Sequence, residues 1–211
     1  MAQQAGDTDM ANLALSWLGS STRLANIDQG GAVAAAARAS LLMQVPAIME
    51  MHPWNFAVTR SSLGANNAEA AEGLEYAFSF DLPNDCLRWL PWRPGDPHHF
   101  EGEQEGTRIL SSCSGPLIVR YISHVADRTR WSPLFARAVT AQLAYDLAEP
   151  IAASQSLRDR MAALFDDALE KARRSDGLAS GRTDRPAPHH LSRSVAAMGR
   201  GGARDPGHWH R

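Results

Sequence analysis

The chain has 211 residues, of which 44% are apolar, enough for a globular core in one large or two small domains. Its formal charge of −2 is unevenly divided, because residues 175–211 carry six Arg and three Asp and the remainder is therefore acidic. An acidic body argues against a protein that wraps DNA or RNA. The two cysteines, Cys86 and Cys113, are typical of a reducing compartment, and neither a signal peptide nor a membrane-spanning segment is expected.

Residues 1–53 are expected to form the first helices. Met10, Leu13, Ala14, Trp17 and Leu18 recur at helical spacing, and Gly19 can end that helix. The run "AVAAAARASLLMQVPAIMEM" is rich in helix-forming residues but contains Pro46. Because proline removes a backbone donor and clashes with the preceding turn, we expect Pro46 to kink or divide this helix.

Residues 54–131 are expected to form an inserted antiparallel β domain, since apolar and polar residues alternate after Pro53. Trp54 and Phe56 open this alternation, and we expect them at a domain hinge, where a large ring can seal the helical and β layers. Strands are predicted in "WNFAVTR", "LEYAFSFDLP", "CLRWLPW", "RILSS" and "LIVRYISHV".

A further helix is expected to begin at Ser132-Pro133, where a capping serine is followed by a proline at the first helical position. Two helices, ending at residue 174, should form a hairpin over 132–174. From residue 175 to 211, Gly, Pro, Ser, Arg and His dominate, which is typical of a flexible arm. The predicted fold class is α+β: an α-helical bundle made from N- and C-terminal helices, with an inserted antiparallel β domain and an extended C-terminal arm.

The chain lacks the common catalytic motifs, such as GxSxG, the phosphate-binding glycine loops, HExxH and CxxC. We therefore predict a protein that is not an enzyme and that uses no cofactor. Cys86, His98, His99 and Cys113 have side chains that can bind zinc, but their spacing matches no usual zinc pattern. Small buried cysteines and histidines in a solvated loop are the favoured interpretation, and no metal site is predicted.

A short acidic stretch contains Glu101, Glu103 and Glu105. A pair of carboxylates could hydrolyse a glycosidic bond. In a strand, however, this spacing places all three side chains on one face. Carboxylates that repel one another in this way more often lie at the solvated edge of a sheet than in a catalytic site. An acidic rim or channel lining is the favoured interpretation, and a glycan hydrolase is the alternative.

The segment 175–211 offers two further interpretations. "GRGGARD" is similar to segments that bind single-stranded nucleic acid, but it occurs once and with a single nearby aromatic residue. Leu191, Val195, Met198 and Trp209 are apolar anchors spaced along a polar segment, which is typical of an arm that orders on a partner protein. The second interpretation is favoured.

Taken together, "ALSWLGS", "HPWNFA", "YAFSFDLPNDCLRW" and "LIVRYISHVADRTRWSPLFARAVTAQLAYDLA" resemble the head-to-tail adaptors of short-tailed bacteriophages, the tail tubular protein A family. The resemblance covers about residues 10–174, in order. It implies a virion protein, made in the host cytoplasm, that forms a dodecameric ring at the head–tail junction.

The resemblance also implies partners. These are the portal protein, the tail nozzle protein, further copies of the chain, and double-stranded DNA that passes without specific binding; no membrane partner is implied. An acidic body suits a DNA conduit, because fixed negative charge repels phosphate. Residues expected to contact the portal lie in the arm: Arg182, Arg185, Leu191, Arg193, Met198 and Trp209.

Overall fold

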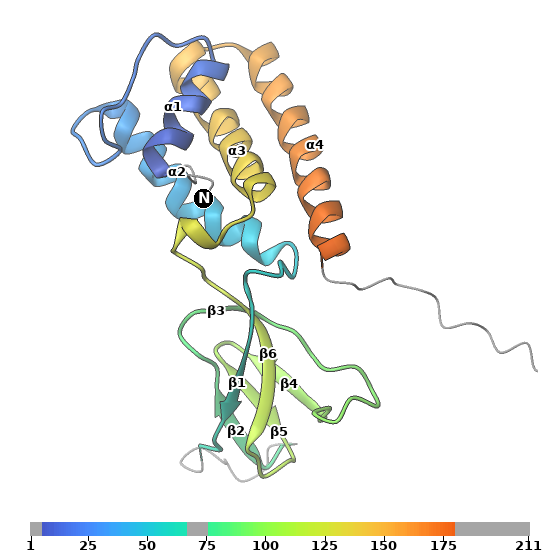
Figure 1. Ribbon diagram of the computed structural model, residues 1–211. Helices are drawn as coiled ribbons and strands as arrows, with labels where there is room; N and C mark the ends of the chain where they lie inside the picture. The colour runs from blue at the N-terminus through green and yellow to red at the C-terminus, as the bar shows by residue number, and fades with distance from the viewer. Residues whose placement is uncertain (1–5, 67–75, 180–211) are drawn as a thin grey trace, which may run out of the picture.

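The computed structural model describes residues 6–66 and 76–179, and it confirms the α+β class. A helical part and a β part lie one above the other, joined by two crossing segments (Figure 1). The helices are α1 (Asp7–Trp17), α2 (Ala32–Glu50), α3 (Pro133–Ala152) and α4 (Gln155–Ala179), with a short 3-10 helix η2 (Arg128–Arg130). The strands are β1 (Val58–Leu63), β2 (Phe78–Asp81), β3 (Cys86–Trp89), β4 (Gly102–Glu105), β5 (Arg108–Ser111) and β6 (Leu117–Ser123).

Two helix ends follow the sequence signals closely. After α1, Gly19 takes φ +71°, and the N–H groups of Gly19 and Ser20 donate to the carbonyls of Ser16 and Leu15. This is the double hydrogen bond of a Schellman ending, which needs a residue that tolerates positive φ. At the start of α3, the Ser132 hydroxyl accepts a hydrogen bond from the Phe135 N–H at 3.2 Å.

Of the two expectations for Pro46, a kink or a division of the helix, the division does not occur, because α2 continues through it as one element of 19 residues. Val45 and Ile48, on either side of the proline, are almost completely buried. Packing of these neighbours offsets the lost backbone hydrogen bond, whose cost is confined to one turn.

The helical part is organised around α3, which contacts α1, α2 and α4. One continuous core includes buried residues of all four helices, and it extends into the β part through Ile122 of β6. The helices before and after the β strands therefore pack together, and the strands lie in the chain between α2 and α3 as an insertion (Figure 1).

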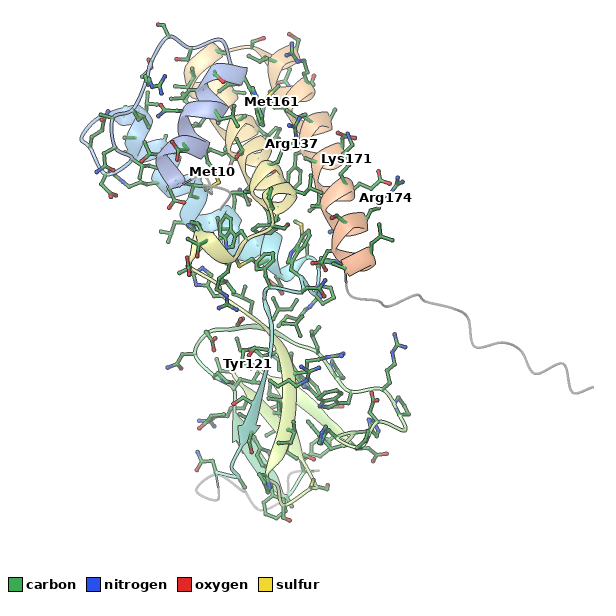
Figure 2. All side chains as sticks on the ribbon, in the orientation of Figure 1. Met10, Tyr121, Arg137, Met161, Lys171 and Arg174 are labelled. Carbon is green, nitrogen blue, oxygen red and sulfur yellow. The ribbon has the colours of Figure 1, made fainter. Side chains whose placement is uncertain are left out.

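The β part consists of two three-stranded antiparallel sheets, with strand orders β1-β6-β3 and β2-β5-β4. A second core lies between them and includes Phe80, Ile109 and Tyr121 (the last labelled in Figure 2). The first strand was predicted to include Trp54, but it begins at Val58. Residues from Trp54 to Ala57 form a turn instead, in which the N–H groups of Ala57 and Val58 donate to the Trp54 carbonyl.

The C-terminal boundary also differs from the prediction. Helix α4 continues to Ala179, so the proposed end at 174 is five residues too early. The Gly and Ser content that indicated an arm from residue 175 does not end the helix, because Asp176 makes contacts described below.

Candidate functional site

Two of the segments that carry the family resemblance, "HPWNFA" and the one that contains "RWSPLF", meet where the helical and β parts join. We call this place the junction and define it by Trp54, Phe56, Trp131 and Phe135. The Phe135 ring lies 5.0 Å from Trp54, 5.0 Å from Phe56 and 4.9 Å from Trp131, each in an edge-to-face arrangement. "HPWNFA" and "RWSPLF" are thus one aromatic cluster, in the geometry that aromatic pairs prefer.

The two indoles of the junction are fully enclosed and have their polar groups satisfied. Trp54 is 0% exposed, and its Nε1–H donates to the Ile48 carbonyl at 3.2 Å. The Nε1–H of Trp131 donates to the Val125 carbonyl at 3.0 Å. The sequence predicts Trp54 and Phe56 at a hinge between the two layers; in the structure they lie in the turn between α2 and β1, Trp54 in the helical core and Phe56 packed against it.

The segment "NDCLRW" is tied to β6 and the residues that follow it. The His124 N–H donates to the Asp85 carbonyl at 2.7 Å, and the Tyr121 hydroxyl donates to the Asp85 carboxylate at 3.2 Å. Burial, with the nearby Asp85 charge, raises the pKa of Tyr121 to about 12. The same two causes raise the pKa of the Cys86 thiol to about 11. Cys86 is therefore protonated at neutral pH, unlike a reactive or metal-binding thiolate.

Asp176, near the end of α4, ties that helix to the "HPWNFA" turn. Its carboxylate accepts from the Asn55 N–H at 2.9 Å and lies 3.1 Å from His52 Nε2, and its carbonyl accepts from the Asn55 amide at 2.8 Å. Sequence reasoning missed these contacts, because the surrounding composition assigned Asp176 to the arm. The last turn of α4, from which residues 180–211 continue, is thus fixed to the junction.

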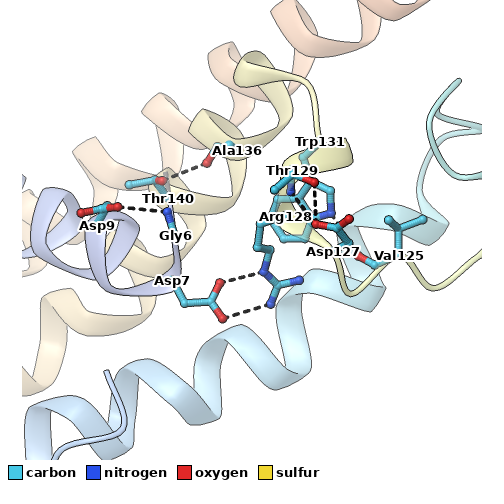
Figure 3. A network of polar contacts seen from close by, with 10 residues as sticks. All are labelled: Gly6, Asp7, Asp9, Val125, Asp127, Arg128, Thr129, Trp131, Ala136 and Thr140. Atoms are coloured by element: carbon cyan, nitrogen blue, oxygen red, sulfur yellow. Dashed lines mark hydrogen bonds and ion pairs between the residues drawn. The ribbon is translucent and has the colours of Figure 1, made fainter. Parts of the chain in front are cut away.

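The segment that returns from the β part is tied to the start of α1. Arg128 donates from Nε to one Asp7 oxygen at 2.7 Å and from Nη2 to the other at 3.3 Å (Figure 3). Its guanidinium also lies 4.2 Å from the centre of the Trp131 ring. A bidentate ion pair whose guanidinium also stacks on an aromatic ring has a fixed geometry. The Arg128–Asp7 pair therefore orients η2 against the helical part.

Helix α2 presents an apolar surface to solvent. We call it the apolar face and define it by Ala35, Ala39, Leu42, Met43 and Ala47, which are all exposed. Leu42 is 76% exposed and Met43 is 69% exposed. Beside this face, α2, Asp7, Ile27 and Arg128 enclose an open groove of about 540 Å³. Exposed apolar surface of this kind marks contact sites for other macromolecules.

The outer side of α4 is different. Lys171 and Arg174 point away from the helix (Figure 2), and each forms an ion pair with a carboxylate one turn earlier, Asp167 and Glu170 respectively. Such a face is well solvated. Among the helices that the structure describes, α2 alone is long and apolar enough to cross a membrane, but its other side is packed in the helical core.

The acidic residues singled out in the sequence lie at the edge of a sheet. Glu103 and Glu105 belong to β4, Glu101 directly precedes it, and all three are exposed. Among the described residues β4 pairs with β5 alone. The three carboxylates do not line the groove beside α2. This arrangement resembles a charged rim more than a catalytic cleft.

The zinc-capable residues are not brought together. In the part of the chain that the structure describes, no group of three or more His, Cys, Asp or Glu side chains could hold a metal ion. His99 and His98 instead lie beside Trp92, whose carbonyl is 3.2 Å from His99 Nδ1. The residues expected to contact the portal lie outside the described residues, being Arg182, Arg185, Leu191, Arg193, Met198 and Trp209.

Comparison with known families and proteins gives no assignment. No protein-family model matches the sequence, and no curated protein matches it.

Proposed function

We propose that this chain is the ring-forming head-to-tail adaptor of a short-tailed bacteriophage, a structural virion protein that joins the portal to the tail nozzle around the DNA exit channel. The observation that carries the proposal is the apolar face of α2. Leu42 and Met43 are too exposed to serve the core of a single chain, so a protein partner that covers them would stabilise the assembly.

The sequence resemblance supplies the kind of partner. Two of its quoted segments come from distant parts of the chain, yet Trp54, Trp131 and Phe135 bring them into one buried cluster. This packing supports the interpretation that the two segments act together in one fold. The charged outer side of α4, in contrast with α2, suits a surface that stays in contact with water.

The test is sedimentation of purified protein with portal rings of the same phage. Wild-type protein should co-sediment at many copies per portal. Leu42→Glu should reduce the number of bound copies, because a carboxylate on the apolar face must be desolvated in the contact. Ala163→Glu is the matched control, since it adds the same charge at an exposed position of α4 and should bind normally.

A truncation tests the arm separately. Removal of residues 180–211 leaves α4 and the Asp176 contacts complete, so the shortened protein should fold and lose portal binding. Portal binding as strong as that of the intact protein would contradict the assignment of the arm. Failure of the intact protein to bind portal rings would contradict the proposed function as a whole.

A further inference from the structure

Three arginines lie on the outer side of the β1-β6-β3 sheet: Arg60 is exposed, and Arg88 and Arg120 are half-buried. Arg60 of β1 and Arg120 of β6 are directly opposite each other, and Arg88 of β3 is opposite Ile122. Side chains of a strand alternate between faces, and Val119 and Tyr121 point into the second core. Arg60, Arg88 and Arg120 therefore share the other side of the sheet, and we call them the arginine face.

Trp92 holds part of this face in place. Its Nε1–H donates to the Ile118 carbonyl at 2.6 Å, and the guanidinium carbons of Arg60 and Arg120 lie 5.8 and 5.1 Å from its ring centre. Like charges directly opposite each other destabilise a sheet, whereas each cation–π contact contributes about 0.5–1 kcal/mol. The Trp92 indole thus offsets the repulsion between Arg60 and Arg120 and keeps their guanidinium groups close together on one surface.

An opposite charge pattern lies on the other sheet. Glu101, Glu103 and Glu105, which we call the acidic edge, are exposed along the edge strand β4. The arginine face belongs to the β1-β6-β3 sheet and the acidic edge to the β2-β5-β4 sheet. One molecule thus carries two complementary patches of three charges each, on different sheets of its β part.

We infer that the arginine face of one copy docks on the acidic edge of the next copy, so that the β parts contribute a head-to-tail contact between neighbours. The inference rests on the proposed function and assigns this contact to its ring. When one patch of a chain binds a different patch of the next copy, a row of copies keeps one unpaired patch at each of its two ends. Both patches are paired only when the row closes into a ring. Charge pairs across such a contact fix its register and speed association.

A second copy fits the arginine face better than DNA does. A DNA duplex carries closely spaced negative charge along its length, and the chain before residue 175 is acidic and repels it. The acidic edge of another copy offers three exposed carboxylates in one stretch of chain, opposite in charge to the arginine face.

A charge-swap experiment tests the inference. One variant carries Arg60→Glu and Arg120→Glu, and the other carries Glu103→Arg and Glu105→Arg. In sedimentation velocity at low salt, wild-type protein should self-associate, and each variant alone should do so at least about tenfold more weakly. An equal mixture of the two should recover association, because each variant then meets its opposite charge. Circular dichroism checks that every variant is folded.

Two controls separate charge from folding and net charge. Arg60→Lys with Arg120→Lys keeps the positive charges and should associate nearly as wild type. Asp159→Arg with Asp166→Arg makes the same change in net charge as the Glu103→Arg, Glu105→Arg variant, but on the exposed side of α4, and it should leave association intact.

Several outcomes would overturn the inference. These are a wild-type protein that stays monomeric at high concentration and low salt, a mixture that does not recover association, and variants that associate as wild type. Binding of a labelled DNA duplex that is lost in the Arg60→Glu, Arg120→Glu variant, with self-association unchanged, would assign the face to DNA instead. Portal co-sedimentation of the wild type is a separate readout, so failure of this contact leaves the proposed function testable.

Discussion

Three large aromatic rings, those of Trp54, Trp131 and Phe135, are fully buried in the helical part, whereas the β part closes on a smaller core around Phe80 and Ile109. The residues of the β core come from one continuous stretch of chain, from Leu63 to Tyr121. The helical core requires both ends of the chain, from Met10 to Ala172. A change in the helical core should therefore affect the whole fold, while a change in the β part should stay more local.

The largest expected effect is at the junction. Trp54→Ala should lower the free energy of unfolding by about 3–5 kcal/mol, because it leaves a cavity beside Phe135 and removes the hydrogen bond to Ile48. Urea denaturation followed by circular dichroism measures this loss. Phe56→Ala, at a neighbouring but only partly buried ring, should cost less. Equal losses for the two variants would show that Trp54 has no special place in joining the two parts.

A pH titration examines the β part. The pKa of Tyr121 is raised from an ordinary value of 10.0 to about 12, and that of Cys86 from 9.0 to about 11. Both groups are neutral when protonated. Because their pKa values are raised in the folded chain, the unfolded chain loses these protons at lower pH than the folded chain. The stabilisation is complete below pH 9 and is lost as the pH rises towards 12.

Unfolding midpoints measured from pH 8 to pH 11.5 check this loss, within the range defined by the two pKa values. Tyr121→Phe removes one of the two groups, so its stability should fall less steeply with pH. An identical slope in wild type and Tyr121→Phe would place the sensitive group elsewhere.

The smallest expected effect concerns the contact between α4 and the junction. Asp176→Ala removes the acceptors for Asn55 and His52, and it should cost about 1–2 kcal/mol. Asp167→Ala, which breaks an exposed ion pair with Lys171 on the same helix, should cost less than about 0.5 kcal/mol. Hydrogen exchange at the end of α4 would show the difference. Equal protection in both variants would mean that Asp176 does not hold the helix end.

Local signals in the sequence predicted much of the fold. Gly19 and the pair Ser132-Pro133 identify helix ends by backbone chemistry that acts within one turn. The alternation in "LIVRYIS" predicts β6, because a strand between a core and an outer surface needs that period. Strand β4 was not among the predicted strands, since its residues Gly102–Glu105 are mostly polar and show no alternation.

What the sequence by itself determined, then, is the class of each long element and their order, since periodicity and capping are properties of neighbouring residues. Only the tertiary structure decided which apolar residues stay exposed. Helix α2 is apolar around most of its circumference, so nothing in its pattern separates buried Leu41 from exposed Leu42. The contact of Asp176 with Asn55 and the placement of Arg60 opposite Arg120 likewise join distant segments, and such pairs are set by packing and strand register.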